Sequence, residues 1–243
     1  MTTHENDPFD DRQLTRRSLL RLAGAAAAVG GGAGLWKLDA SDAAAASGSG
    51  PLAVSSGLVS CVLTPELTEG PYYVAGEKLR HDITEGKPGA ALLLRLAVVN
   101  ASTCKAIKNA TVDVWHCDAL GEYSGAVAGS AGTNFLRGVQ RTNAAGVASF
   151  TTIYPGFYQG RAVHLHVKVH VGGHVVHTGQ LFFPAGITNA VYAKQPYAAH
   201  GTTPDTSNPE DSIFRNGGSK GMLKLVKTSA GYTGSIGMGV HVS

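Results

Sequence analysis

The residues best placed to do chemistry are two histidines in the segment 161–170, His164 and His166. Apolar and polar side chains alternate along this segment, which predicts a β-strand whose alternate residues share a face. The apolar face would carry Val163, Leu165, Val167 and Val169. The two histidines would lie about 7 Å apart on the opposite face, by the rise per residue of a strand. They can bind one metal ion together if other segments complete the ligand set. A solvent-exposed strand face that carries histidines would show the same sequence pattern.

Two tyrosines in flanking loops could complete such a set. Tyr158 lies in the turn-forming segment 154–161, just before the histidine strand, and Tyr123 lies in a glycine-containing loop after the segment 111–117. A single loop tyrosine is most often an amphipathic contact residue. Together with the two histidines, however, two loop tyrosines could supply a set of two phenol and two imidazole metal ligands.

Short β-type segments separated by turn residues must position these side chains. We expect strands over residues 92–99, 111–117, 147–153, 162–171 and 174–183, with edge strands added by 222–226 and 232–242. Residues 188–199 are the only stretch expected to hold a short helix. Strands of this length and spacing predict an all-β fold, either a β-sandwich or a barrel, rather than a helical domain.

The N-terminal region is typical of a targeting signal rather than of part of the folded domain. Arg16 and Arg17 precede an Ala/Gly-rich apolar run, 22–36, which is too short for a stable membrane span. This pattern predicts a cleavable twin-arginine export signal over residues 1–46, with several cleavage registers near 42–47. The alternative is an N-terminal anchor helix. Export by this route would leave a secreted or envelope-associated protein without a stable membrane span.

The remaining chain predicts one domain. Residues 47–60 are Ser/Gly-rich and predict a flexible tether, followed by a single domain over 61–243. The whole chain has 243 residues, a net charge of +3 and 15% charged residues, which excludes a disordered chain and argues against nucleic acid as a partner.

The three cysteines are too few for a disulfide scaffold. In an oxidising compartment they would give one disulfide and one free buried thiol, although folding before export could leave all three reduced. Cys104 lies between two strands expected to pair, which makes a bridge to Cys117 awkward and favours Cys61–Cys104.

Five motifs in order along the chain resemble those of the intradiol ring-cleavage dioxygenases, the protocatechuate/catechol dioxygenase superfamily, and of its exported twin-arginine branch. They cover residues 64–73, 112–123, 154–158, 161–166 and 180–183. The resemblance implies a β-sandwich core with long active-site loops that holds one non-haem Fe(III) per chain, with four ligands: Tyr123, Tyr158, His164 and His166. Hard anionic phenolates favour Fe(III), whose charge lets tyrosine ionise well below a pKa of about 10. Tyr158 and His164 would be axial, and the other two equatorial.

The resemblance also implies a reaction. Catechol-type diols would be cleaved by O2 between the two hydroxyl-bearing carbons, giving muconate-type dicarboxylates. Tyr158 would leave the metal and act as an internal base, Arg161 would stabilise charge on the substrate ring, and Gln180 would add a second polar contact. Tyr72 and Tyr73 would line the pocket mouth, unless either of them only packs.

Two other interpretations of the sequence compete with an intradiol dioxygenase. A cupin oxygenase also uses His-x-His, but it normally has a glutamate a few residues later, where this chain has His170. A non-catalytic exported β-sandwich module could bind aromatic or carbohydrate ligands, although it would not need two tyrosines and two histidines in these contexts. The sequence leaves open the preferred catechol, for which the segment 124–136 is expected to matter, and the oligomeric state.

Overall fold

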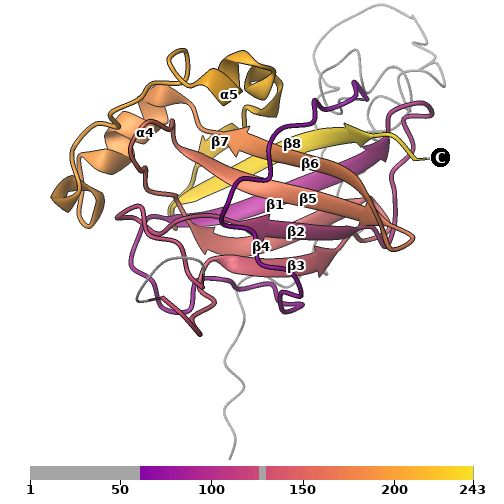
Figure 1. Ribbon diagram of the computed structural model, residues 1–243, viewed down its shortest axis with the longest axis horizontal. Coiled ribbons are helices and arrows are strands. Elements are labelled where there is room, and N and C mark those ends of the chain that lie inside the picture. The colour runs from indigo at the N-terminus through magenta and orange to yellow at the C-terminus, as the bar shows by residue number, and fades with distance from the viewer. Residues whose placement is uncertain (1–60, 126–129, 243) are drawn as a thin grey trace, which may run out of the picture. The chain divides into compact units, whose positions relative to one another are not determined.

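Two four-stranded sheets form the fold in a computed structural model that describes residues 61–125 and 130–242 (Figure 1). The first sheet has the order β4-β1-β8-β7 and the second β3-β2-β5-β6. The strands of the first sheet are β1 (Ala91–Asn100), β4 (Val147–Ile153), β7 (Lys224–Lys227) and β8 (Tyr232–Val240). Those of the second are β2 (Thr111–Trp115), β3 (Arg137–Arg141), β5 (His164–Val171) and β6 (His174–Phe182). The expected all-β sandwich is therefore confirmed.

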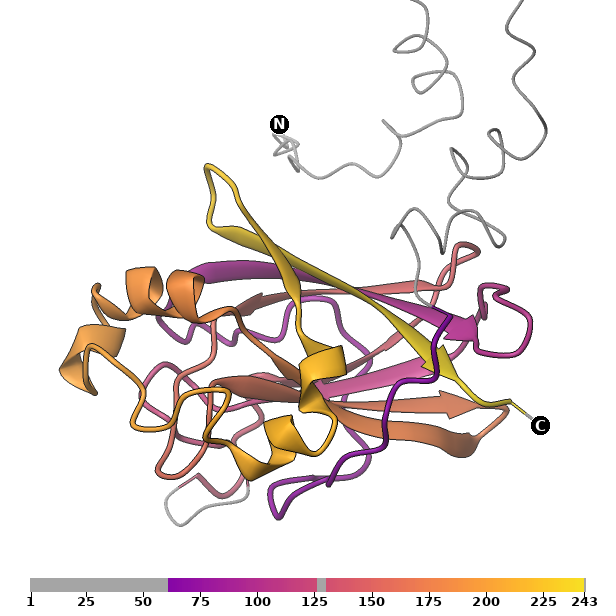
Figure 2. The same ribbon diagram turned by 90° about the horizontal axis from the view of Figure 1, so that it is seen from above.

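Helical segments occur in the connection between β6 and β7. They are α4 (Ala185–Tyr192), α5 (Ser212–Arg215) and the 3-10 turns η2 (Tyr197–Ala199) and η3 (Gly218–Gly221). The helix α4 lies at the end of the sandwich opposite the C-terminus, as both views show (Figure 2). In the part of the chain that the structure describes, no helix is long and apolar enough to cross a membrane. The predicted signal, 1–46, and tether, 47–60, lie outside the described residues.

The core lies between the sheets and follows from period-two patterning. In β1, every second residue from Leu92 to Val98 is buried. In β5, Leu165, Val167 and Val169 are fully buried in the same cluster. The apolar face expected for the histidine strand is therefore a core face.

The structure differs from the sequence prediction in four elements. The helix α5 lies outside the range 188–199 to which helix was confined, and the side chain of Asp211 caps its N-terminus. β8 pairs in parallel with β1 and antiparallel with β7, so it is an inner strand and not an edge. β3 follows directly on the segment 124–136 and was not expected, because its sequence, Arg-Gly-Val-Gln-Arg, has little apolar character. The helix expected over 188–199 begins earlier, after Pro184, and is interrupted before η2.

The outer face of the second sheet is covered by the segment 64–82. This segment crosses the four strands in spatial order, with Leu67 bonded to β6, Glu69 paired with Lys168 in β5, Tyr73 bonded to β2 and Arg80 bonded to β3. Figure 1 shows it as the indigo trace in front of the sheet. Because of this cover, the polar face of β5 is buried rather than solvated.

The disulfide expected between Cys61 and Cys104 is present, with Cα atoms 5.2 Å apart. It ties the start of the described chain to the turn after β1. Cys117 is free and buried, as expected.

Candidate active site

One cross-strand row on the outer face of the second sheet carries the polar and aromatic side chains of the site. The strand register aligns Gln180 with His166, His166 with Trp115, and Trp115 with Arg137. Because paired residues of neighbouring strands point to the same face, these four side chains form a ladder across β6, β5, β2 and β3. Trp115 stacks on His166, with ring centroids 4.9 Å apart and an interplanar angle of 10°.

The two histidines of β5 point at one place. Their Nε2 atoms are 3.2 Å apart, and both side chains are buried. Nδ1 of His164 lies 2.7 Å from the carbonyl oxygen of Ala162, which can only accept, so Nδ1 carries the proton and Nε2 presents a lone pair. Burial lowers the pKa of His164 to about 3 and that of His166 well below its usual value, so both imidazoles are neutral at pH 7.

The two tyrosines expected as ligands reach the same place from loops. The hydroxyl of Tyr158 lies 3.2 Å from Nε2 of His164. The ring of Tyr123 lies 5.8 Å from that of Tyr158 and 6.2 Å from that of His166, centroid to centroid. Burial raises the pKa of both phenols, while the Arg161 guanidinium opposes this rise, so each phenol is protonated in the absence of another cation.

This donor set fits a hard, highly charged cation. The Tyr123 hydroxyl is buried and has no hydrogen-bond partner, and Nε2 of His164 faces Nε2 of His166 and the Tyr158 hydroxyl. A cation would satisfy these oxygens and nitrogens together. Among residues 61–125 and 130–242, no group of three or more His, Cys, Asp or Glu side chains could hold a metal ion. A metal at the cluster would therefore have to use the phenols.

Arg161 and Gln180 lie against this cluster. Nη1 of Arg161 is 3.3 Å from the Tyr158 hydroxyl and 3.3 Å from Nε2 of His164. Its Nη2 donates to Oε1 of Gln180, whose own amide donates to the carbonyl oxygen of Thr68 at 2.9 Å. The arginine thus presents one edge to the donor atoms, where it can stabilise negative charge on a bound molecule.

The paired tyrosines after Gly70 have different surroundings. The Tyr72 ring stacks on Tyr123 at 4.4 Å and meets Tyr158 edge-on at 6.0 Å, so it lies over both expected phenol ligands. Tyr73 turns away, packs on Trp115 and donates its hydroxyl to Asp113 at 3.1 Å. Of the two, Tyr72 is therefore placed to contact a substrate and Tyr73 is placed to pack.

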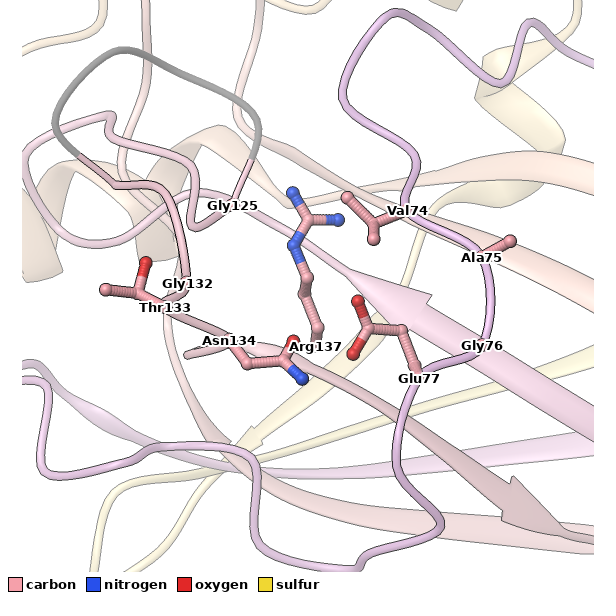
Figure 3. Close-up of a pocket in the computed structure, with 9 residues that line it drawn as sticks. All are labelled: Val74, Ala75, Gly76, Glu77, Gly125, Gly132, Thr133, Asn134 and Arg137. Carbon is pink, nitrogen blue, oxygen red and sulfur yellow. The ribbon is translucent and has the colours of Figure 1, made fainter.

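A separate cavity of about 280 Å³ lies beside this cluster (Figure 3). Arg137 projects into it opposite Glu77, and its guanidinium carbon is 5.8 Å from the centroid of the Tyr123 ring. Neither imidazole nor either expected phenol ligand lines the cavity. We therefore place the candidate site at the donor cluster rather than in this cavity.

Three residues close to the site were not singled out from the sequence. Trp115 and Arg137 reach it through strand register, and Asp211 reaches Arg161 from the start of α5. The alternation of β2 could have placed Trp115 on the outer face, but no local signal pairs it with His166. Asp211 could have been read as a helix N-cap, although not as a partner of Arg161.

Comparison with known proteins identifies the family. The family described as "Dioxygenase" matches residues 68–193. Catechol 1,2-dioxygenase 2 of Acinetobacter lwoffii is 36% identical over 99 residues, which are 39% of this chain and 35% of that protein. Chlorocatechol 1,2-dioxygenase of Cupriavidus pinatubonensis is 30% identical over 147 residues, 51% of this chain and 55% of that one. The matches thus span from about a third to about half of these curated relatives.

Solved structures extend the similarity over most of the sandwich. An intradiol ring-cleavage dioxygenase from Tetranychus urticae has a TM-score of 0.71 and 33% sequence identity, over 74% of this chain and 95% of that chain. The dioxygenase domain of a dioxygenase–carbohydrate-binding fusion from Streptomyces sp. SirexAA-E has a TM-score of 0.57 and 28% identity, over 74% and 99%.

Proposed function

The chain belongs to the intradiol ring-cleavage dioxygenase family, and on that premise we propose that it is a non-haem Fe(III) enzyme acting on catechol-type diols. The reaction would use O2 to cleave the ring between the two hydroxyl-bearing carbons, giving a muconate-type dicarboxylate. The observation that carries the proposal is the convergence of two neutral imidazoles and two buried phenols on one place.

Four side chains would hold the iron: Tyr123, Tyr158, His164 and His166. When bound, ferric iron would be chelated by both catechol oxygens and would draw electron density from the ring, which makes the ring reactive toward O2. Two phenolate ligands suit this role because they offset most of the charge of the ion. The neutral imidazoles suit it because neither has to lose a proton to the solvent before binding.

Tyr158 is the better candidate for the proton acceptor. Its side chain is partly exposed, whereas Tyr123 is 1% exposed and stacked under Tyr72. In the proposed reaction, Oη of Tyr158 takes a proton from a catechol hydroxyl and swings away, while Tyr123 stays in place. Nη1 of Arg161 is 3.3 Å from the Tyr158 hydroxyl, and the guanidinium stabilises the negative charge that develops on the substrate.

The surrounding residues orient the site and limit its access to water. Trp115 holds the His166 ring from one face, and Gly70 brings the backbone against its edge, where an added Cβ would lie 3.2 Å from Cε1. Tyr72 covers the ring of Tyr123 but meets Tyr158 only edge-on. A flat aromatic substrate can therefore approach the site from the side of Tyr158. Preformed packing of this kind lowers the cost of orienting a substrate.

Visible absorption tests the proposed ligand set. Iron-loaded protein should be reddish, because ferric tyrosinate has a charge-transfer band, and catechol added without oxygen should change the hue. A protein that stays colourless and inactive after iron reconstitution would refute the proposal. It would favour the alternative, a non-catalytic module that binds aromatic or carbohydrate ligands.

We also propose that the protein is exported through the twin-arginine pathway. The Cys61–Cys104 disulfide supports this location, since disulfides persist in oxidising compartments. Fractionation of cells that express the full chain tests it, with Arg16→Lys/Arg17→Lys as the matched variant. Export of the wild type and retention of the variant is the expected result.

A further inference from the structure

Asp211 is a buried carboxylate that the proposed chemistry leaves unexplained. It precedes α5, 50 residues after Arg161 in the chain, and is 1% exposed. Its two oxygens receive four hydrogen bonds. A buried carboxylate with this many donors is fixed in orientation, since any rotation would leave a charged oxygen unpaired.

The two oxygens serve different parts of the fold. Oδ1 accepts from the backbone nitrogens of Ile213, at 2.7 Å, and Phe214, at 3.1 Å, and so caps the N-terminus of α5. Oδ2 accepts from Nε of Arg161, at 2.8 Å, and from the backbone nitrogen of Ala162, at 2.9 Å. One carboxylate therefore joins α5 to the segment that enters β5.

The ion pair is formed at neutral pH. Burial alone would raise the pKa of Asp211, but the hydrogen bond from Ala162 and the Arg161 guanidinium outweigh it and lower the pKa below its usual value. The carboxylate is thus ionised when Arg161 is charged, and the side chain of Arg161 is itself only 17% exposed.

The hydrogen bonds to Arg161 determine which of its edges faces the site. A guanidinium is planar, so anchors on two of its nitrogens fix the direction of the third. Asp211 holds Nε and Gln180 holds Nη2, which leaves Nη1 directed at the Tyr158 hydroxyl and Nε2 of His164. Without Asp211, the guanidinium would keep one neutral anchor and could rotate about it.

We propose that Asp211 is a positioning residue, which holds Arg161 so that Nη1 faces the substrate. This inference rests on the proposed function and deepens it, because it assigns the orientation of the arginine to a residue of the β6–β7 connection. A small displacement of a charge-stabilising group is enough to slow catalysis by about 100-fold.

Asp211→Ser separates the two roles of the carboxylate. Serine is a good N-cap and can still accept from Phe214, but it is too short to reach Arg161. We expect kcat to fall by about 10- to 100-fold, while the iron content and the visible band stay near those of the wild type. The melting temperature should fall, because the Arg161 guanidinium and the Ala162 N–H lose their acceptor. The matched control is Glu210→Gln, since this neighbouring exposed carboxylate bonds Ser207 and not Arg161. It should keep the wild-type kcat.

A double-mutant cycle tests whether Asp211 acts through Arg161. In an Arg161→Ala background, adding Asp211→Ser should cause no further loss of kcat. An unchanged kcat in Asp211→Ser alone would overturn the inference. An equal loss in both backgrounds would overturn it as well, because that result indicates a general structural role.

A signal independent of turnover keeps the test apart from the proposed function. In the ¹⁵N NMR spectrum of the full protein loaded with diamagnetic Ga(III) in place of paramagnetic iron, the Nε–H of Arg161 should exchange slowly in the wild type and rapidly in Asp211→Ser. If the wild type fails to cleave catechols, the proposed function fails. This resonance still decides whether Asp211 holds the Arg161 guanidinium in place. Equal exchange rates of the Arg161 Nε–H in both proteins would overturn the inference. If Asp211→Ser does not fold, Asp211→Thr provides the same comparison, since threonine is also an N-cap and is as short as serine.

Discussion

The indole of Trp115 lies flat on the imidazole of His166, at 4.9 Å and 10°. This contact matters because the Nδ1 atom of His166 is buried without a hydrogen-bond partner, whereas Nδ1 of His164 is bonded to Ala162. The orientation of His164 is thus fixed by a hydrogen bond, and that of His166 by packing.

Replacing Trp115 should weaken iron binding. Trp115→Leu removes the flat support of His166, and loss of a residue that orients a metal ligand typically costs about 10- to 100-fold in metal affinity. Competition with a chelator measures this affinity. Trp115→Phe keeps an aromatic face and should lose much less, and equal affinity in all three proteins would contradict the orienting role.

Gly70 should be needed for its contact with His166 as well as for its backbone angle. Its φ is +75°, and a Cβ would lie 3.2 Å from Cε1 of His166, whereas Gly76 has a φ of +82° and open space around it. Alanine at either position costs about 1 kcal/mol of stability for the left-handed backbone. Gly70→Ala should also lower the iron affinity, and Gly76→Ala should not. Similar iron affinities in chelator titrations would show that the contact is unimportant.

Tyr158→Phe and His166→Ala should separate the two proposed roles. The phenylalanine variant should keep its iron, since Tyr158 is the ligand that leaves in the proposed reaction, but lose about 10²- to 10⁴-fold in kcat without its proton acceptor. The alanine variant should lose the iron, because a rigid strand ligand is gone. Metal analysis and steady-state kinetics measure both effects, and full activity in both variants would refute the assignment.

The alternation of residues 161–170 was enough to predict that His164 and His166 share a face, because period two is a local property of strands. It could not predict that this face is buried, since the cover comes from the segment 64–82, far away in the chain. Tyr123 and Tyr158 were singled out as tyrosines in the loops that flank the histidine strand, and the structure brings both to the histidines. Asp211 was missed because its contact with Arg161 depends on the path of the β6–β7 connection.

His116 should contribute a pH-dependent part of the stability. It is fully buried between the carbonyl oxygen of Cys117 and the Thr152 hydroxyl, and burial lowers its pKa to about 4, from 6.5. Its folded pKa lies below the unfolded value, so its contribution is complete above about pH 6.5 and is lost as the pH falls toward 4. At about 1.4 kcal/mol per unit, the loss is about 3 kcal/mol.

Urea unfolding of the wild type and His116→Gln between pH 7 and pH 4 measures this contribution. The stability difference between the two proteins should shrink as the pH falls. A difference that is constant with pH would show that His116 does not titrate as its burial implies.

We propose that the cluster around His164 and His166 performs intradiol ring cleavage. Identification of the product formed from catechol by the iron-loaded protein under O2 tests it most directly. We expect a muconate-type dicarboxylate, formed mole for mole with the O2 consumed and absent with His166→Ala. A semialdehyde from cleavage beside the diol, a quinone, or unchanged catechol with no O2 consumed would contradict it.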